Sequence, residues 1–315
     1  MIRTKTGAAA LSIASNSLLI LLKLIAGALT GSIAIITEAI HSGIDLIASI
    51  VAYVSVRRAD LPPDESHPYG HAKVESLAAA IEGMLILVGA GIIIYEATRR
   101  LVSGSEVESL GIGIAVIAFS MVANVVVSTF LSRRARALHS PALEGDAAHL
   151  RTDALTSFGV LAGLALVELT GAPAFDAIAA LVVALAIVGA GARILWRSGG
   201  VLVDEALPSE ELDRIEAVIR REGIPEVIGY HKLRARGAAG RRHVDLHVQF
   251  RDGTSLERAH EAAHQLRDAI AAELGGADVL VHLEPESSAR EMHDSPLRWA
   301  AEGGRWGQIE RRRPG

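Results

Sequence analysis

The chain has no cysteine, which excludes disulfide bonds and thiolate metal sites. Any metal ion must therefore be held by His, Asp, Glu, backbone carbonyl oxygens or water. Aromatic residues make up 4% of the sequence, and no basic patch is interleaved with them, so nothing indicates a nucleic-acid partner. Charged residues are scarce before residue 204 and frequent after it, so the net charge of −5 says little about partners.

Long apolar runs fill the first 200 residues instead. Six of them reach the ~20 residues that cross about 30 Å of hydrocarbon. The first run is long and others follow it, so we interpret it as a span and not as a signal peptide. We therefore expect a membrane α-helical protein with a six-helix bundle, whose spans are 7–29, 32–56, 76–101, 109–131, 147–169 and 174–194.

Lys and Arg residues beside the spans favour one orientation, because cytoplasmic loops carry an excess of positive charge. If the N-terminus is cytoplasmic, the outer loops hold only Arg99 and Arg100. The inner segments then hold ten basic residues, which are Arg3, Lys5, Arg57, Arg58, Lys73, Arg133, Arg134, Arg136, Arg193 and Arg197. We therefore expect both termini on the cytoplasmic side of the membrane.

A change of pattern after residue 203 predicts a second domain. Helical patterns at 210–222 and 255–274 alternate with strand patterns at 227–236, 241–250 and 277–285, in the order α-β-β-α-β. This order in about 80 residues predicts a compact α+β domain of the ferredoxin-like (αββαβ) type. The expected division is 1–203 for the transmembrane domain, 204–286 for the cytoplasmic domain and 287–315 for a flexible tail.

Ionisable residues interrupt two of the spans with the same spacing. In "EAIHSGIDLIAS", His41 and Asp45 are four residues apart, and in "HLRTD", His149 and Asp153 repeat that spacing. Residues four apart share a helix face, so two helices can offer four ligands to one ion. Such a set suits tetrahedral Zn²⁺, and it would also accept Co²⁺, Fe²⁺ or Cd²⁺. Glu38, one turn from His41, either supports a ligand or faces the bundle.

A contact within one helix would explain a single His–Asp pair as well as a metal site would. Two pairs of identical composition and spacing in different spans favour a metal site, because ionisable groups in lipid are costly and are usually kept for function. We interpret them as one intramembrane site for a divalent cation.

The sequence resembles the cation diffusion facilitator family over residues 5–286. The resemblance rests on "SIAIITEAIHSGIDLIAS" in the second span, "HLRTDALTSFGVL" in the fifth and the α-β-β-α-β domain. It implies a homodimer in the bacterial inner membrane that exports divalent metal ions in exchange for protons. It also implies that His41, Asp45, His149 and Asp153 form the transport site, in a set similar to that of zinc-preferring members. Relatives with Asp in place of His41 handle more metals, so Cd²⁺, Co²⁺, Fe²⁺ and Mn²⁺ remain alternatives.

The resemblance implies further sites outside the spans. Asp64, His67 and His71 would form a second metal site in the loop "DESHPYGHAKVES". Lys73 and Asp204 would form a charge pair that ties the dimer together at the membrane surface. A two-metal cluster at the dimer interface would use His231, His247, His260, His282 and Glu284. Zinc bound there would regulate transport, or would serve structure alone.

The segment "HEAAH", His260 to His264, also fits the H-E-x-x-H zinc motif of metalloproteases. This match leaves a second class of function open, which is a membrane-tethered metal sensor or metalloenzyme. The domain is too small for the usual cleft, however, and neither activity needs the second His–Asp pair in the fifth span. We therefore predict a transporter and not an enzyme, and we interpret His243 and His264 as surface residues.

Overall fold

The computed structural model describes residues 4–30, 33–103, 112–172, 174–287 and 305–308. Within these ranges, the side chains of Glu38 and His41 lie outside the described part of the structure. The chain divides into two compact units, Met1–Val203 and Asp204–Gly315.

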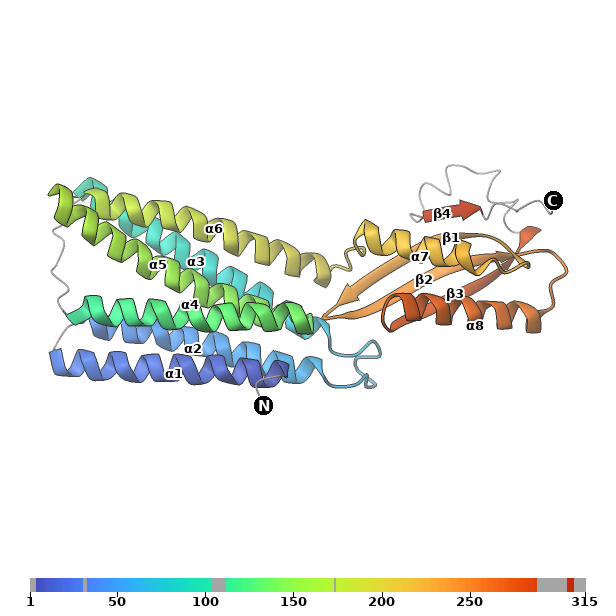
Figure 1. Ribbon diagram of the computed structural model, residues 1–315, viewed down its shortest axis with the longest axis horizontal. Coiled ribbons are helices and arrows are strands. Elements are labelled where there is room, and N and C mark those ends of the chain that lie inside the picture. The colour runs from blue at the N-terminus through green and yellow to red at the C-terminus, as the bar shows by residue number, and fades with distance from the viewer. Residues whose placement is uncertain (1–3, 31–32, 104–111, 173, 288–304, 309–315) are drawn as a thin grey trace. The chain divides into compact units, whose positions relative to one another are not determined.

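Among the described residues, the first unit contains six long helices, which run side by side (Figure 1). Five of them are long and apolar enough to cross a membrane, among the residues that the structure describes. The remaining one is α2, which carries the ionisable residues discussed above. The helices are α1 (Lys5–Thr30), α2 (Ile33–Ala59), α3 (Lys73–Ser103), α4 (Ile112–Leu138), α5 (Pro141–Thr170) and α6 (Ala174–Leu202).

Several helices extend beyond the apolar runs from which they were predicted. The start of α5 lies at Pro141 and not at residue 147, because Ser140 caps the helix by accepting a hydrogen bond from the backbone N–H of Leu143. Pro141 occupies the first helical position, where its missing N–H has no cost. An apolar run indicates only the part of a helix that lies in lipid. The helix itself continues until its terminal backbone groups are capped, so it can be longer than the apolar run.

The contact between α3 and α6 is made possible by glycine. A Cβ added to Gly83 would lie 3.0 Å from the backbone nitrogen of Leu195 and 3.2 Å from the carbonyl oxygen of Gly191. A Cβ added to Gly191 would lie 2.9 Å from Cγ2 of Ile86. Small residues are typical of helix contacts in lipid, because backbones must approach closely to gain dispersion energy.

The second unit is an α/β arrangement with one sheet. Its strand order is β3-β2-β1-β4, in which β1 and β2 are antiparallel and β2 and β3 are parallel. The α-β-β-α-β order predicted from the sequence is confirmed by the first five elements. In chain order the elements are α7 (Ser209–Glu222), β1 (Val227–Ala238), β2 (Arg241–Phe250), α8 (Leu256–Glu273), β3 (Ala277–Pro285) and β4 (Arg305–Gln308).

Local sequence explains the hairpin and the core of this unit. Ala239 and Gly240 connect β1 to β2 with φ angles of 47° and 86°, the positive values that a two-residue type I′ turn requires. Alternate residues of the strands, such as Leu246 and Val248, pack against Ile215 of α7 and Leu266 of α8 in one apolar core. The remaining alternate residues lie on the other face of the sheet.

We expected a flexible tail over residues 287–315, and this prediction is wrong for the four residues that form strand β4. Four tail residues, Arg305–Gln308, pair in antiparallel fashion with β1, where Tyr230 lies opposite Gly307. The ranges 288–304 and 309–315 lie outside the described residues. A strand of four residues carries no apolar period of its own, so the sequence pattern did not indicate it.

Candidate functional site

Three of the four predicted intramembrane ligands meet between α2 and α5. The Nε2 atom of His149 lies 3.1 Å from Oδ1 of Asp45 and 3.9 Å from Oδ2 of Asp153. Asp45 and His149 are each only 6% exposed. One ligand atom from each of the three residues lies within 4.8 Å of the others, which is close enough for one ion. His149 occupies the third turn of the 30-residue helix α5.

The fourth predicted ligand, His41, is on α2 one turn before Asp45, and its side chain lies outside the described residues. The same holds for Glu38. A fourth ligand from this position is geometrically reasonable because residues four apart on a helix lie above one another. The four-ligand set therefore stays a prediction.

The chemistry of this group favours a divalent cation. Two carboxylates and one imidazole lie in a largely apolar environment, where an uncompensated negative charge is strongly disfavoured. A doubly charged cation would balance the two carboxylates, and the imidazole adds a neutral nitrogen ligand. The other imidazole nitrogen of His149, Nδ1, is buried and has no hydrogen-bond partner in the described part of the chain.

A second group lies in the loop between α2 and α3. Asp64 accepts hydrogen bonds from the backbone N–H groups of Ser66 and His67, at 2.9 and 2.7 Å. The bond from the His67 backbone is the largest cause that lowers the pKa of Asp64 below its usual value. Its carboxylate oxygens also lie 3.2 Å from Nδ1 of His67 and 3.3 Å from Nε2 of His71. The three predicted loop residues are thus together, with potential ligand atoms within 4.8 Å.

A third group lies on the sheet of the second unit. His231, His247 and His282 are register neighbours on β1, β2 and β3, so they form a row across three strands. Glu284 lies two residues beyond His282 and therefore on the same face. Its carboxylate oxygens lie 2.6 Å from Nε2 of His231 and 2.6 Å from Nδ1 of His247. His282 is more distant, with Nε2 3.7 Å from the same carboxylate.

This group has electrostatics suited to holding a cation. Burial alone would raise the pKa of Glu284, but the hydrogen bonds with His247 and His231 outweigh it and lower that pKa. Burial lowers the pKa of His247, although Glu284 opposes the effect. A carboxylate that stays charged and an imidazole that stays neutral are the protonation states that metal binding requires.

The predicted fifth member of this cluster, His260, is not brought to it within one chain. His260 and His264 lie on the exposed side of α8 with ring centroids 4.2 Å apart. The opposite side of α8 buries Ala259, Ala262 and Leu266 in the core. Because α8 packs on the core face of the sheet and the cluster lies on the other face, a second copy of the chain would be needed to bring a His260 to it.

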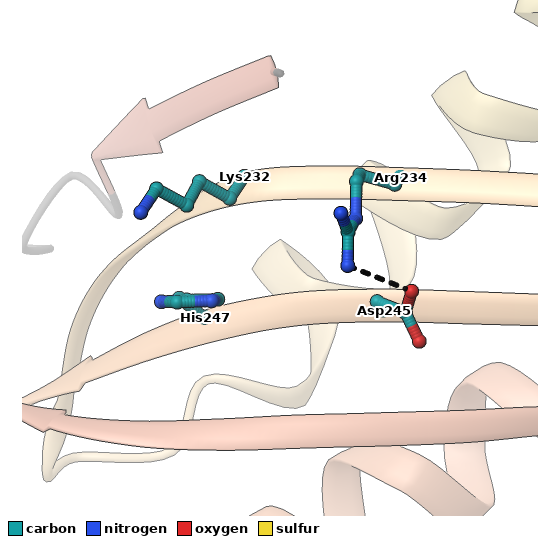
Figure 2. Close-up of a pocket in the computed structure, with 4 residues that line it drawn as sticks. All are labelled: Lys232, Arg234, Asp245 and His247. Atoms are coloured by element: carbon teal, nitrogen blue, oxygen red, sulfur yellow. Dashed lines mark hydrogen bonds and ion pairs between the residues drawn. The ribbon is translucent and has the colours of Figure 1, made fainter. Parts of the chain in front are cut away.

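A cavity of about 360 Å³ adjoins the cluster. Figure 2 shows Lys232, Arg234, Asp245 and His247 around it, with Lys232 on β1 and His247 on β2 directed to the same space. Arg234 donates to Asp245 across 3.2 Å. His247 therefore belongs both to this candidate metal-binding group and to the wall of the cavity.

The two residues of the predicted dimer charge pair have partners within their own units. Lys73 donates to the carbonyl oxygen of Leu202 at 3.2 Å. Asp204 lies 2.8 Å from the Arg236 guanidinium. Their pairing with each other stays a prediction.

Sequence reasoning overlooked other ionisable residues inside the helices. Glu82 of α3 and Asp146 of α5 are both fully buried, and Lys23 of α1 is buried with Nζ 2.7 Å from Oγ of Ser42. Glu75 of α3 is buried as well and binds Lys5 at 2.7 Å. The signal that could have found them is the one applied to His41 and Asp45, namely an ionisable residue within an apolar run.

Comparison with known proteins connects this architecture to cation export. Residues 9–203 match the family model described as "Cation efflux transmembrane domain", and residues 207–286 match "Cation efflux protein, cytoplasmic domain". The chain is 34% identical over 288 residues to the cation-efflux pump FieF of Yersinia pestis, covering 91% of this chain and 95% of that one. It is 33% identical over 267 residues to an uncharacterized transporter of Synechocystis sp., covering 84% and 85% of the two chains.

Among solved structures, a chain of the candidate zinc transporter CzrB is 32% identical, covers 25% of this chain and 98% of that one, and has a TM-score of 0.25. A model match over more than half of the sequence, and a pump similar along nearly its whole length, show the family of the chain. The protein is thus a membrane transporter and a member of the cation diffusion facilitator family.

Proposed function

We propose that this protein exports divalent metal ions, zinc foremost, from the cytoplasm in exchange for protons. The observation that carries the proposal is the meeting of Asp45, His149 and Asp153 between two long helices of the first unit. Ionisable side chains are costly in lipid, and their retention there marks an ion pathway. Nitrogen and carboxylate ligands without sulfur suit zinc and leave cobalt, iron, manganese and cadmium as alternatives within the same function.

Exchange for protons follows from the ligand chemistry. A His residue must be neutral to bind a metal ion, and an unperturbed His takes up a proton near pH ~6.5. Protons that enter from outside would therefore compete with the metal ion for His149 and His41. In this proposal the bundle alternates between an inward-open state that loads metal and an outward-open state that releases it.

The proposed topology places all six helices, α2 included, across the bacterial inner membrane with both termini in the cytoplasm. The cytoplasmic domain is then of ferredoxin-like type and joins two copies in a homodimer. Zinc at His231, His247, His282 and Glu284, with His260 from a second copy, would bias the spans toward a transport-competent state. Lys73 and Asp204 would support the same dimer, and Asp64, His67 and His71 would hold a metal ion at the loop.

No observation favours the metalloenzyme as a second function. Glu261, which would be the general base of the HEAAH segment, pairs with Arg258 at 3.3 Å on an exposed helix face. The three metal-binding groups in the described residues do not include His260 or His264. A hydrolytic zinc site also needs a third protein ligand and an open coordination position for the attacking water.

The test is transport in proteoliposomes that contain the purified full-length protein. A zinc-sensitive dye and a pH-sensitive dye are enclosed together, and zinc is added outside with and without a pH gradient. We expect zinc flux that moves protons in the opposite direction and that stops in Asp45→Ala. The control is Glu144→Gln, which removes an exposed carboxylate that binds Arg197 at 2.8 Å.

Two results would contradict the proposal. Zinc flux that is indifferent to the pH gradient would refute proton exchange, and normal flux in Asp45→Ala would refute the site. The same assay with Cd²⁺, Co²⁺, Fe²⁺ and Mn²⁺ measures metal preference, because each ion competes for the same ligands.

A further inference from the structure

Glu82 and Asp146 are two buried carboxyl groups that the metal-binding groups do not use. Glu82 lies in the third turn of α3 and Asp146 in the second turn of α5, and both side chains are 0% exposed. Asp146 is three residues before His149 and does not belong to the intramembrane group. Neither carboxyl has a Lys or Arg partner in the described part of the chain, so their burial needs another explanation.

The Glu82 carboxyl is held against the backbone of α5. A Cβ added to Gly145 would lie 2.6 Å from Oε2 of Glu82 and 3.1 Å from Cα of Ala79. Glycine at position 145, next to Asp146 in sequence, is therefore what leaves room for the Glu82 carboxyl. Both Glu82 oxygens are buried and have no hydrogen-bond partner among the described atoms.

Only one of the two carboxylate oxygens of Asp146 has hydrogen-bond partners in the described residues. Its Oδ1 atom accepts hydrogen bonds from Ser12 of α1 and Ser49 of α2, each at 3.0 Å. Its Oδ2 atom is buried and has no partner in the described residues. The two hydroxyl donors position one oxygen of Asp146 and leave the other open.

The charged groups on the surrounding helices contact other residues, and none of these contacts neutralises the pair. These contacts are Lys5 with Glu75, Arg197 with Glu144, Asp45 with His149, Lys23 with Ser42, and Arg151 with Ser132 of α4. A buried carboxylate with neither donor nor counter-charge is too unfavourable to persist in the ionised form. The Glu82 carboxyl lies against Gly145, the residue next to Asp146, and a second buried negative charge nearby makes ionisation of both carboxyls still less favourable.

We propose that Glu82 and Asp146 form a proton-holding site that is separate from the metal ligands. At neutral pH in the metal-free protein, one proton resides on the pair, with Glu82 as its main carrier because that carboxyl accepts no hydrogen bond. The pair lies near the second and third turns of α3 and α5, which begin side by side where Ser140 binds Glu75. The substrate of this site is a proton.

The consequence for transport rests on the proposed function. A divalent cation that binds at His149 adds positive charge one turn beyond Gly145, which favours loss of the proton from the pair. By linkage, the proton weakens metal binding to the same degree that the metal weakens proton binding. The pair would thus add a proton to those displaced from the ligands themselves.

The experiment is infrared spectroscopy of the metal-free, full-length protein in lipid nanodiscs at neutral pH. We expect a carbonyl stretch of a protonated, water-shielded carboxyl group that is lost or shifted in both Glu82→Gln and Asp146→Asn. Glutamine has the shape of protonated Glu, so Glu82→Gln decides the matter if Asp146→Asn fails to fold. Glu144→Gln, on the same helix as Asp146 but exposed, should leave the band unchanged.

Calorimetric zinc titrations in buffers of different ionisation enthalpy give a second, independent measurement. Wild type should release about one proton more per zinc ion than Glu82→Gln, as linkage requires. Absence of the band in wild type, or spectra that are identical in wild type and both variants, would overturn the inference. Because the band is measured without metal or transport, a protein that keeps the band but fails to carry zinc would contradict the proposed function alone.

Discussion

The glycine contact between α3 and α6 allows a prediction with an internal control. Gly191 is buried against α3, whereas Gly189, on the same helix, has no atom within 4 Å of an added Cβ. Replacing either glycine by Ala should gain the same ~1 kcal/mol of helix propensity. The difference between the two variants therefore isolates the cost of the added methyl group at the contact.

The magnitude follows from the atoms that the methyl group would meet. At Gly191 these are Cγ2 of Ile86 at 2.9 Å, Cγ of Leu87 at 3.1 Å and the carbonyl oxygen of Gly83 at 3.2 Å. The two side chains can move, but the carbonyl oxygen belongs to the backbone of α3. Overpacking of this kind costs about 1–3 kcal/mol. We expect Gly191→Ala to be less stable than Gly189→Ala by that amount, a factor of about 5 to 150 in the unfolding equilibrium.

The measurement is unfolding in mixed detergent micelles, followed by far-ultraviolet circular dichroism. Gly189→Ala should unfold at the same denaturant fraction as wild type or slightly later, and Gly191→Ala clearly earlier. Equal stability of the two variants would refute the idea that close backbone approach holds α3 to α6.

Two further predictions concern metal and pH. His41→Asp should broaden metal use, with Cd²⁺ or Fe²⁺ flux rising relative to Zn²⁺ in proteoliposomes, because an oxygen ligand replaces a nitrogen; an unchanged preference would show that His41 does not set selectivity. In the cytoplasmic unit, the pKa of His247 is lowered from 6.5 and that of Glu284 from 4.5, so at each residue the unfolded state binds protons more readily than the folded state. Metal-free protein should therefore lose stability as pH falls below about 6.5, and lose more below about 4.5; a melting temperature of the cytoplasmic unit that stays flat from pH 8 to pH 4 would contradict this.

Much of the fold was predictable because its signals are local. Apolar runs of membrane length located the helices, and the "GAAG" turn located the β1–β2 hairpin. The ends of the helices were harder, since Ser140 and Pro141 extend α5 through capping and not through hydropathy. Strand β4 was not predictable, because its pairing with β1 is a long-range contact that leaves no period in four residues.

Some residues of the candidate sites could likewise be predicted from local sequence, and others only from the packed structure. Equal spacing in two helices predicted the residues Asp45, His149 and Asp153, and the structure brings these three together. Glu82 was overlooked because a lone carboxyl in an apolar run has no partner in the neighbouring sequence. The Glu82 carboxyl fits beside Gly145, which belongs to another helix. Only the packed structure therefore shows that the missing side chain at Gly145 leaves room for Glu82.

The depth of His149 has an electrical consequence. With a rise of ~1.5 Å per residue, the third turn places His149 about 12 Å from the start of α5 and far from the other end of a 30-residue helix. In the proposed orientation, an exported ion still has most of the membrane voltage ahead of it after binding, at about 2.3 kcal/mol per charge per 100 mV. Two returning protons would cancel the charge of the metal ion, whereas one would leave the cell's inside-negative voltage opposing export. The voltage dependence of zinc flux therefore reports how many protons return for each metal ion.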